Sequence, residues 1–265
     1  MLTACRCGGN RGRPARLTRS TSACRDTIAS MHFEEVIERL ATVPAVLPGP
    51  PSELNPLVLG PSDVVVHPGP AISRGSADGR PRHPAVPVDA RIPWPPGPRR
   101  RAAALVLLFP SATGEAHVVL IERPHGDLRH PGEISFPGGE IEASDPSVEA
   151  AALREAREEV GLDPQRAGVR ILGRLDVVEI RASGFELVPV LALAERRPGF
   201  RADPHEVERV LEVPLRHFLA GAPIEIVEED RSGWRMRYGV FPADGLRVWG
   251  ATARVLGQLG AILDR

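Results

Sequence analysis

The segment at residues 150–160 constrains the fold of this chain most strongly, because it carries both an apolar stripe and a cluster of acids. Its apolar side chains recur at three- and four-residue spacing, which predicts a helix with one buried face: Leu153, Ala156 and Val160. Its glutamates stand at positions i, i+3 and i+4, so their carboxylates share another face: Glu155, Glu158 and Glu159. Asp145 or Ser147 suits the start of this helix, and Gly161 suits its end.

Three carboxylates on one helical turn repel each other, and the residues alone allow two explanations. The acids can form a solvated surface balanced by Arg154 and Arg157, as charge runs usually do. Alternatively, they can hold a hard cation such as Mg²⁺ or Mn²⁺, which prefers carboxylate and water oxygens. Gly138 and Gly139 precede the helix, and a residue without a Cβ lets a metal or a phosphate approach the backbone closely.

Strand-like segments surround this helix in an order that favours a mixed sheet. Residues 102–109 form an apolar run that predicts a buried strand, and a turn leads to a second strand at residues 117–122, which could lie antiparallel beside it. Further elements are predicted as strands at residues 169–175, 187–193 and 224–227, and as an amphipathic helix at residues 251–263. Because the regular βαβ alternation of a doubly wound sheet is missing, we predict an α/β protein whose mixed sheet is flanked by helices.

The region before residue 101 has a different composition. Residues 1–30 are rich in Arg, Ser and Thr, which predicts a disordered tail or sequence ahead of a start at Met31; the composition is also shared with organelle transit peptides. Residues 33–43 have the repeat of a short helix. About half of the 28 prolines follow before residue 100, so we expect residues 31–100 to hold that helix and an irregular, partly extended connection.

Composition excludes several classes of function. The formal net charge of -1 and the 4% aromatic content give no surface for bulk nucleic-acid binding. The longest apolar runs are shorter than the roughly 20 residues that a helix needs to cross a bilayer. All three cysteines, Cys5, Cys7 and Cys24, lie in the first part of the chain, so a reducing cytoplasm is the expected location.

The glycines, acids and helix together resemble the Nudix box, in which a glycine, an acid, an Arg-Glu pair, a Glu-Glu pair and a glycine recur across a short stretch. The matching residues here are Gly139, Asp145, Arg154, Glu155, Glu158, Glu159 and Gly161. The resemblance implies a Nudix-type α/β/α sandwich that hydrolyses a pyrophosphate bond with Mg²⁺ or Mn²⁺. It also implies that Glu155, Glu158, Glu159 and the carbonyl of Gly138 hold the metal, while Arg154 orients Glu155 and pairs with Asp145.

The flanking sequence resembles the coenzyme A pyrophosphatase branch of this family. The matching stretches are residues 120–123, 128–139, 183–185, 189–190, 205–207, 213–215 and 249–253. Two spacings depart from the common pattern, one before Gly132 and one between Asp145 and Arg154. The resemblance implies a Nudix hydrolase domain at residues 101–265 that cleaves coenzyme A or its derivatives into 4'-phosphopantetheine and adenosine 3',5'-bisphosphate.

Two alternative functions stay open at this point. A Nudix enzyme for ADP-ribose or for oxidised nucleoside triphosphates shares the box, and a non-catalytic nucleotide-binding module shares the fold. Either way the partner is a small nucleotide, with coenzyme A as the favoured ligand, and a homodimer is left open.

Three further residues are candidates for the chemistry. A base must accept a proton from the attacking water, and Glu158 or Glu159 could do so, but a carboxylate bound to metal is a poor base. Glu206 is therefore the preferred base, although an acid opening a helix at Pro204 would look the same. Arg123 and Arg129 are the candidate cations for the 3'-phosphate, together with the Gly138-Gly139 backbone; either arginine could instead be an ordinary surface residue.

Overall fold

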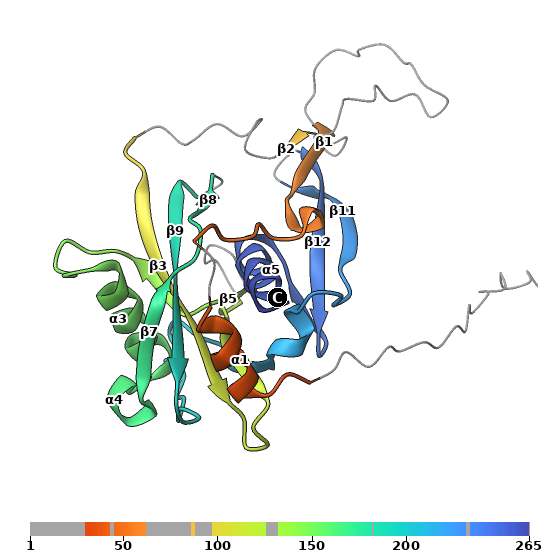
Figure 1. Ribbon diagram of the computed structural model, residues 1–265. Helices are drawn as coiled ribbons and strands as arrows, with labels where there is room; N and C mark the ends of the chain where they lie inside the picture. The colour runs from red at the N-terminus through yellow and green to blue at the C-terminus, as the bar shows by residue number, and fades with distance from the viewer. Residues whose placement is uncertain are drawn as a thin grey trace, which may run out of the picture.

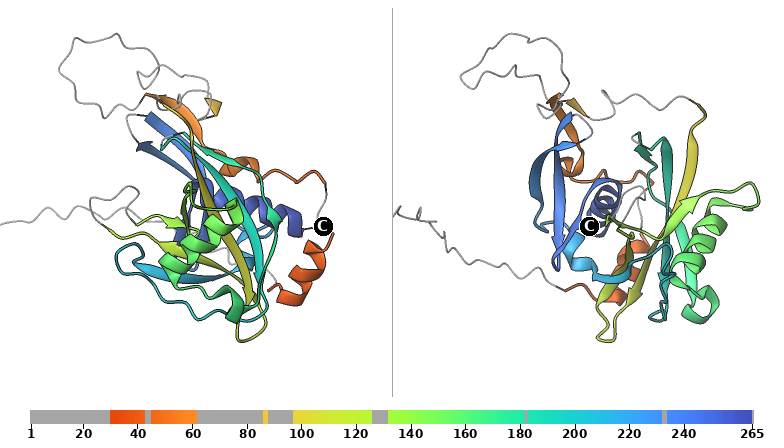
Figure 2. Two further views of the ribbon diagram at one scale, coloured as in Figure 1. Left: turned by 90° about the vertical axis from the view of Figure 1, so that its left-hand side faces the viewer. Right: turned by 180° about the vertical axis from the view of Figure 1, so that it is seen from behind.

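The computed structural model describes residues 30–42, 45–61, 86–87, 97–125, 132–181, 183–231 and 234–264. The predicted tail therefore lies outside the described residues except at its last position. Two β-sheets face each other across the helix α5, as Figures 1 and 2 show. No helix among the described residues combines the length and the apolar character that crossing a membrane requires.

The larger sheet has eight strands among the described residues and is mixed, as predicted. Its main path runs β10-β4-β3-β9-β7, and three short strands pair beside it. Strands β3 and β9 are parallel, whereas β4, β6 and β7 pair antiparallel with their neighbours. Its strands are β3 (Arg100–Pro110), β4 (Ala116–Glu122), β5 (Ile134–Ser135), β6 (Gly138–Glu140), β7 (Val169–Arg174), β8 (Val178–Ile180), β9 (Phe185–Ala194) and β10 (Arg209–Pro214).

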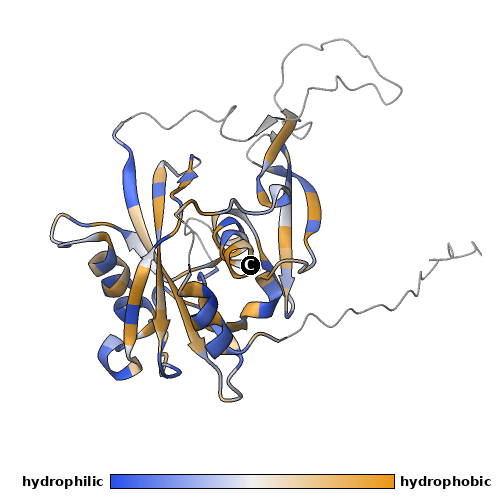
Figure 3. Cartoon of the chain, in the orientation of Figure 1, coloured by the Kyte–Doolittle hydropathy of each residue, from blue (hydrophilic) through white to orange (hydrophobic). Residues whose placement is uncertain are grey.

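Alternate side chains of β3 divide between two cores, because successive residues of a strand point to opposite faces. Ala103, Leu105 and Leu107 are buried with the apolar face of the helix α3 (Val148–Val160). Their neighbours Ala104, Val106 and Leu108 are buried with the helices α1 (Phe33–Leu40) and α5 (Gly250–Leu263) on the other face. The sheet is thus covered by helices on both faces, which agrees with the predicted Nudix-type α/β/α sandwich, and Figure 3 shows its apolar central strands.

The second sheet has five strands in the part of the chain that the structure describes, and it was not predicted apart from a strand at residues 224–227. Its path runs β11-β12-β1-β2, with β13 beside β12. The strands are β1 (Leu57–Pro61), β2 (Val86–Pro87), β11 (Glu225–Arg231), β12 (Trp234–Ala243) and β13 (Leu246–Val248). The proline-rich connection thus supplies the short strands β1 and β2 and the 3-10 turn η1 (Ser52–Leu54) to an ordered layer.

The N-terminal segment is fastened to the C-terminal helix. The predicted helix near residue 33 is confirmed as α1, and its apolar side chains Phe33, Val36 and Leu40 are buried. The Arg39 guanidinium donates a hydrogen bond to the Leu263 carbonyl at the end of α5. Two short helices complete the described elements: α4 (Pro164–Ala167) lies between α3 and β7, and η2 (Leu215–Phe218) lies between β10 of the larger sheet and β11 of the second.

The buried amide of Gln258 adds a second fastening. Its Nε2 donates to the Pro48 carbonyl at 3.0 Å and to Asp176 Oδ2 at 2.6 Å, and its Oε1 accepts from the Asp176 N–H at 3.1 Å. One side chain of α5 thereby joins the N-terminal segment to the loop that follows β7.

Candidate active site

The acidic helix has a cap and an end that the sequence predicts, although its first residue differs. The Ser147 hydroxyl caps α3 by accepting from the Ala150 N–H at 3.1 Å, and Gly161 ends it with a left-handed φ of 62°. Asp145 has a different role, because its carboxylate accepts from the Glu142 N–H and from Arg154. The helix begins at Val148, two residues earlier than the apolar repeat indicates.

The two glycines of β6 lie where a side chain would collide, but with different neighbours. A Cβ at position 138 would stand 2.4 Å from the Ala103 carbonyl oxygen and 2.7 Å from Ala104 Cα, on the adjacent strand β3. A Cβ at position 139 would stand 2.5 Å from the carboxyl carbon of Glu155. Gly138 therefore allows β6 to pair with β3, and Gly139 makes room for a carboxylate of α3.

Arg154 is the centre of an ion-pair network. Its Nε and Nη2 donate to the two oxygens of Asp145, both at 3.0 Å, which is the bidentate geometry of a strong pair. Its Nη1 donates to Glu155 Oε1 at 2.8 Å and to Glu158 Oε2 at 3.0 Å. Its Nη2 also donates to the Glu140 carbonyl at 3.1 Å. The hydrogen bonds that Arg154 donates to Asp145 lower the pKa of Asp145 and raise the pKa of Arg154.

Burial disfavours a negative charge on Glu159 and also on Glu155, which is partly buried. Glu159 is only 3% exposed, and burial raises its pKa to about 8 although its carboxylate accepts the Gly138 N–H at 2.8 Å. Burial also raises the pKa of Glu155, against the opposing effect of Arg154. A cation placed among these carboxylates would offset the cost of their desolvation and reduce the repulsion between them.

Glu206 and Arg123 lie close enough to the acidic helix to act on it electrostatically. Glu206 raises the pKa of both Glu155 and Glu159, and Arg123 lowers that of Glu159. The loop that carries Glu206 is tied to the end of α3, because the Asp203 N–H donates to the Glu159 carbonyl at 2.9 Å. Arg123 follows β4, and its guanidinium forms no ion pair or hydrogen bond with another described residue.

Within the described ranges, no three acid, histidine or cysteine side chains are already gathered as a metal centre. The reason lies in the network above, because Arg154 holds the Glu155 and Glu158 carboxylates while the Gly138 N–H holds Glu159. The donor set still fits a hard divalent cation: these are carboxyl groups on one helical turn, the Glu158 side chain is 55% exposed, and the buried Glu159 carboxyl accepts the Gly138 N–H beside them.

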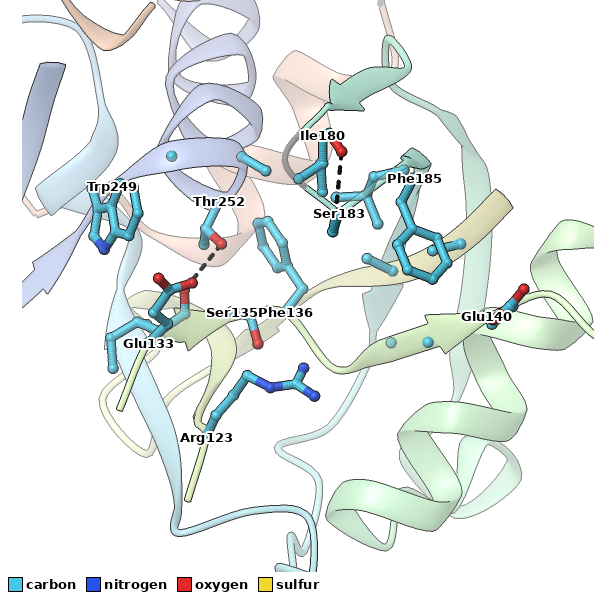
Figure 4. Close-up of a pocket in the computed structure, with 18 residues that line it drawn as sticks. Arg123, Glu133, Ser135, Phe136, Glu140, Ile180, Ser183, Phe185, Trp249 and Thr252 are labelled. Atoms are coloured by element: carbon cyan, nitrogen blue, oxygen red, sulfur yellow. Dashed lines mark hydrogen bonds between the residues drawn. The ribbon is translucent and has the colours of Figure 1, made fainter. Parts of the chain in front are cut away.

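A cavity of about 380 Å³ opens beside the glycine pair, as Figure 4 shows. Its wall is mainly apolar and includes the rings of Phe136, Phe185 and Trp249. Arg123, Gly138 and Gly139 also line it, so the cavity adjoins the acidic helix. The Thr252 hydroxyl at the start of α5 donates to the Ile134 carbonyl at 3.0 Å and fixes that helix against the cavity.

The structure thus brings together most of the predicted site residues: Arg123, Gly138, Gly139, Arg154, Glu155, Glu158, Glu159 and Glu206. Arg129, with its neighbour His130, lies outside the described residues. Sequence reasoning missed Arg100, whose guanidinium carbon lies 3.9 Å from the centroid of the Phe185 ring. The available signal was its position immediately before the buried strand, next to Arg99 and Arg101.

Comparisons with known proteins support a single family. The sequence model of the NUDIX domain matches residues 98–230. "Uncharacterized Nudix hydrolase NudL" of Enterobacter sp. (strain 638) is 34% identical over 161 residues, which covers 61% of this chain and 81% of that protein.

Solved structures with the same type of domain are also similar. The Nudix hydrolase RenU of M. smegmatis is 24% identical, with a TM-score of 0.37 over 44% of this chain and 71% of that chain. The NUDIX domain of Shewanella oneidensis NrtR, solved with ADP ribose, is 23% identical, with a TM-score of 0.36 over 45% of this chain and 75% of that chain.

Proposed function

Because this chain belongs to the Nudix family of hydrolases, we propose that it cleaves the pyrophosphate bond of coenzyme A or its derivatives with Mg²⁺ or Mn²⁺. The reaction would give 4'-phosphopantetheine and adenosine 3',5'-bisphosphate. Family membership itself makes the chain a Nudix pyrophosphohydrolase, and the choice of coenzyme A is the proposal.

One observation carries this choice of substrate. The stretches at residues 183–185 and 249–253, which resemble the coenzyme A pyrophosphatase branch, are far apart in the sequence, but both contribute to the wall of the same cavity. The stretch at residues 132–139 lines that cavity as well, through Glu133, Phe136 and the glycine pair. Residues that carry the resemblance therefore surround one space beside the acidic helix.

The residues of this chain suit hydrolysis of a phosphoanhydride. Glu155, Glu158, Glu159 and the Gly138 carbonyl would hold the metal, which when bound neutralises phosphate charge and activates water. Arg123 offers a guanidinium without an ion-pair partner among the described residues, which suits a phosphate of the substrate. Glu206, on an exposed turn beside the cluster, would accept the proton of the water.

The test is a substrate panel with a matched pair of variants. Purified protein is incubated with coenzyme A, acetyl-coenzyme A, NADH, ADP-ribose and oxidised dGTP under Mg²⁺ or Mn²⁺, and the products are separated by chromatography. We expect the highest kcat/KM with coenzyme A species and no cleavage by Glu158→Gln. The control is Glu149→Gln, which changes a glutamate of the same helix that pairs with Arg174 instead.

The outcomes separate the proposal from its alternatives. A higher kcat/KM for ADP-ribose or oxidised dGTP would contradict the coenzyme A assignment and leave the family chemistry intact. Cleavage that survives Glu158→Gln would contradict the assigned site. Binding of nucleotides without any cleavage would identify a non-catalytic module, although all three helix glutamates are present here.

A further inference from the structure

The cavity has two aromatic walls, and each is supported from behind. Phe185 lines the cavity, whereas Arg100, whose guanidinium carbon lies 3.9 Å from the ring centroid, does not. Trp249 also lines the cavity, whereas Tyr238, at 5.1 Å between ring centroids, does not. In each pair the supporting side chain therefore lies away from the cavity. In Figure 4 the Phe185 and Trp249 rings lie on opposite sides of the view, with Phe136 between them.

The Phe185 ring is held in place from several directions. The Arg100 guanidinium that covers it also donates to Glu140 Oε2 at 3.3 Å and to the Ser183 carbonyl at 3.4 Å. These contacts link the start of β3 to β6 and to the turn before β9. A cation over an aromatic ring is attracted to it, so Arg100 restrains the ring as well as covering it.

We propose that this cavity binds the adenine base of the nucleotide substrate, with Phe185 as the stacking surface and Arg100 as the residue that positions it. The inference rests on the proposed function only in that the substrate contains an adenine nucleotide. A volume of about 380 Å³ is at the lower end of ligand pockets, so the cavity holds one part of a coenzyme-sized molecule.

The shape and the polar groups of the cavity favour the base over the pantetheine arm. A flexible arm with two amides has no ring to stack on an aromatic wall, whereas every nucleobase has a flat face that stacks on one. The buried Ser135 hydroxyl lines the cavity and has no hydrogen-bond partner among the described residues, so it can serve a ring nitrogen. Arg123 and the glycine pair line the same cavity next to the acidic helix, which suits the phosphate attached to the nucleoside.

The two products of the proposed reaction provide the test, because each carries one half of coenzyme A. Binding of adenosine 3',5'-bisphosphate and of 4'-phosphopantetheine is measured by titration calorimetry on the full chain, without turnover. Phe185→Leu keeps apolar volume but removes the planar face. We expect it to weaken the binding of adenosine 3',5'-bisphosphate by about tenfold. Phe185→Trp keeps a planar face and should retain this affinity, and 4'-phosphopantetheine should bind all three proteins equally.

A second pair of variants tests Arg100. Arg100→Met should weaken the binding of adenosine 3',5'-bisphosphate and raise KM for the substrate, with little change in kcat. Arg99→Met is the matched control, because the neighbouring Arg99 pairs with Glu186 and does not cover the ring. Circular dichroism of each variant verifies that it is folded.

Three results would overturn the inference: no measurable binding of the bisphosphate to the wild-type chain, equal binding by Phe185→Leu, or a loss confined to 4'-phosphopantetheine. The proposed function fails separately. If coenzyme A is not cleaved but bisphosphate binding still depends on Phe185, the base site stands and the coenzyme A assignment falls. If coenzyme A is cleaved and Phe185→Leu binds the bisphosphate normally, the coenzyme A assignment stands and the base site falls.

Discussion

Gly139→Ala should inactivate the protein with little effect on its folding. The added Cβ would lie 2.5 Å from the carboxyl carbon of Glu155, whereas nonbonded carbons pack at about 3.5 to 4.0 Å. The carboxylate must therefore move away by about 1 Å, and a misplacement of that size at a catalytic site costs about 100-fold in rate. Because the displaced atoms are the end of a flexible side chain, the free energy of unfolding should change by less than about 1 kcal/mol.

Gly138→Ala is the matched control, because it places the same methyl group one residue earlier. There the Cβ would lie 2.4 Å from the Ala103 carbonyl oxygen and 2.7 Å from Ala104 Cα, both in the backbone of β3. These atoms cannot rotate away, so the strands must separate, and overpacking of this kind costs about 1 to 3 kcal/mol of stability. This variant should lose stability as well as activity.

Two measurements distinguish the glycine variants. Urea unfolding gives their free energies of unfolding, and initial rates give kcat/KM for the best substrate of the panel over a range of Mg²⁺ concentrations. The reasoning is refuted if Gly139→Ala keeps kcat/KM within about threefold of wild type, or if it unfolds as readily as Gly138→Ala. The first result would show that Glu155 need not occupy its present position.

Three further predictions concern buried and paired groups. Burial raises the pKa of Glu159 to about 8 from 4.5. In protein stripped of divalent cations, its contribution to the free energy of unfolding is therefore complete below pH 4.5 and is lost as the pH rises through 8. Glu159→Gln should abolish this pH-dependent loss of stability, which is on the order of a few kcal/mol and is measured by urea unfolding. Arg174 lowers the pKa of Glu149 from 4.5 to about 2, so this pair stabilises the fold above pH 4.5 and ceases to do so as the pH falls through 2. Because the pair is partly exposed, Glu149→Gln should lower the free energy of unfolding by under about 1 kcal/mol above pH 4.5. Unfolding of the variant and of the wild type near pH 2 should show no such difference. Gln258→Leu should lower the free energy of unfolding by about 0.5 to 1.5 kcal/mol in the same assay, because it removes the hydrogen-bond partner of the Pro48 carbonyl and the Asp176 N–H. An unchanged midpoint would show that water replaces the amide.

Elements with local signals could be predicted from the sequence, and the acidic helix shows why. A cap at Ser147, a left-handed end at Gly161 and the apolar repeat between them act within a few residues, so the sequence carries them directly. The same holds for β3 and β4, whose pairing needs only a short turn. The positions of these elements follow from interactions between residues that are close in the sequence.

The second sheet could not be predicted, because its pairing partners are distant in the chain. Strand β1 pairs with β12, joining Leu57 to Arg237, and no residue near Leu57 indicates that partner. Prolines at both ends of β1 also favoured an irregular segment, although a short strand between prolines still pairs through its middle residues. The contact of Arg100 with Phe185 is hidden for the same reason, since parallel pairing of β3 and β9 creates it.

The network around Arg154 explains how the acidic helix can be both stable and ready for a cation. Arg154 donates to both oxygens of Asp145, whose side chain is 5% exposed and which is not among the proposed ligands, so this pair can persist when a metal binds. The third guanidinium nitrogen of Arg154, Nη1, donates to Glu155 and Glu158 and so balances part of the negative charge that the metal would neutralise. A cation therefore replaces only part of this network, because the bidentate pair with Asp145 keeps Arg154 anchored beside the helix. Glu159 differs from these two, since Arg154 donates no hydrogen bond to it and burial raises its pKa in spite of the Gly138 N–H and the nearby charge of Arg123, which makes it the carboxylate with most to gain from a bound metal.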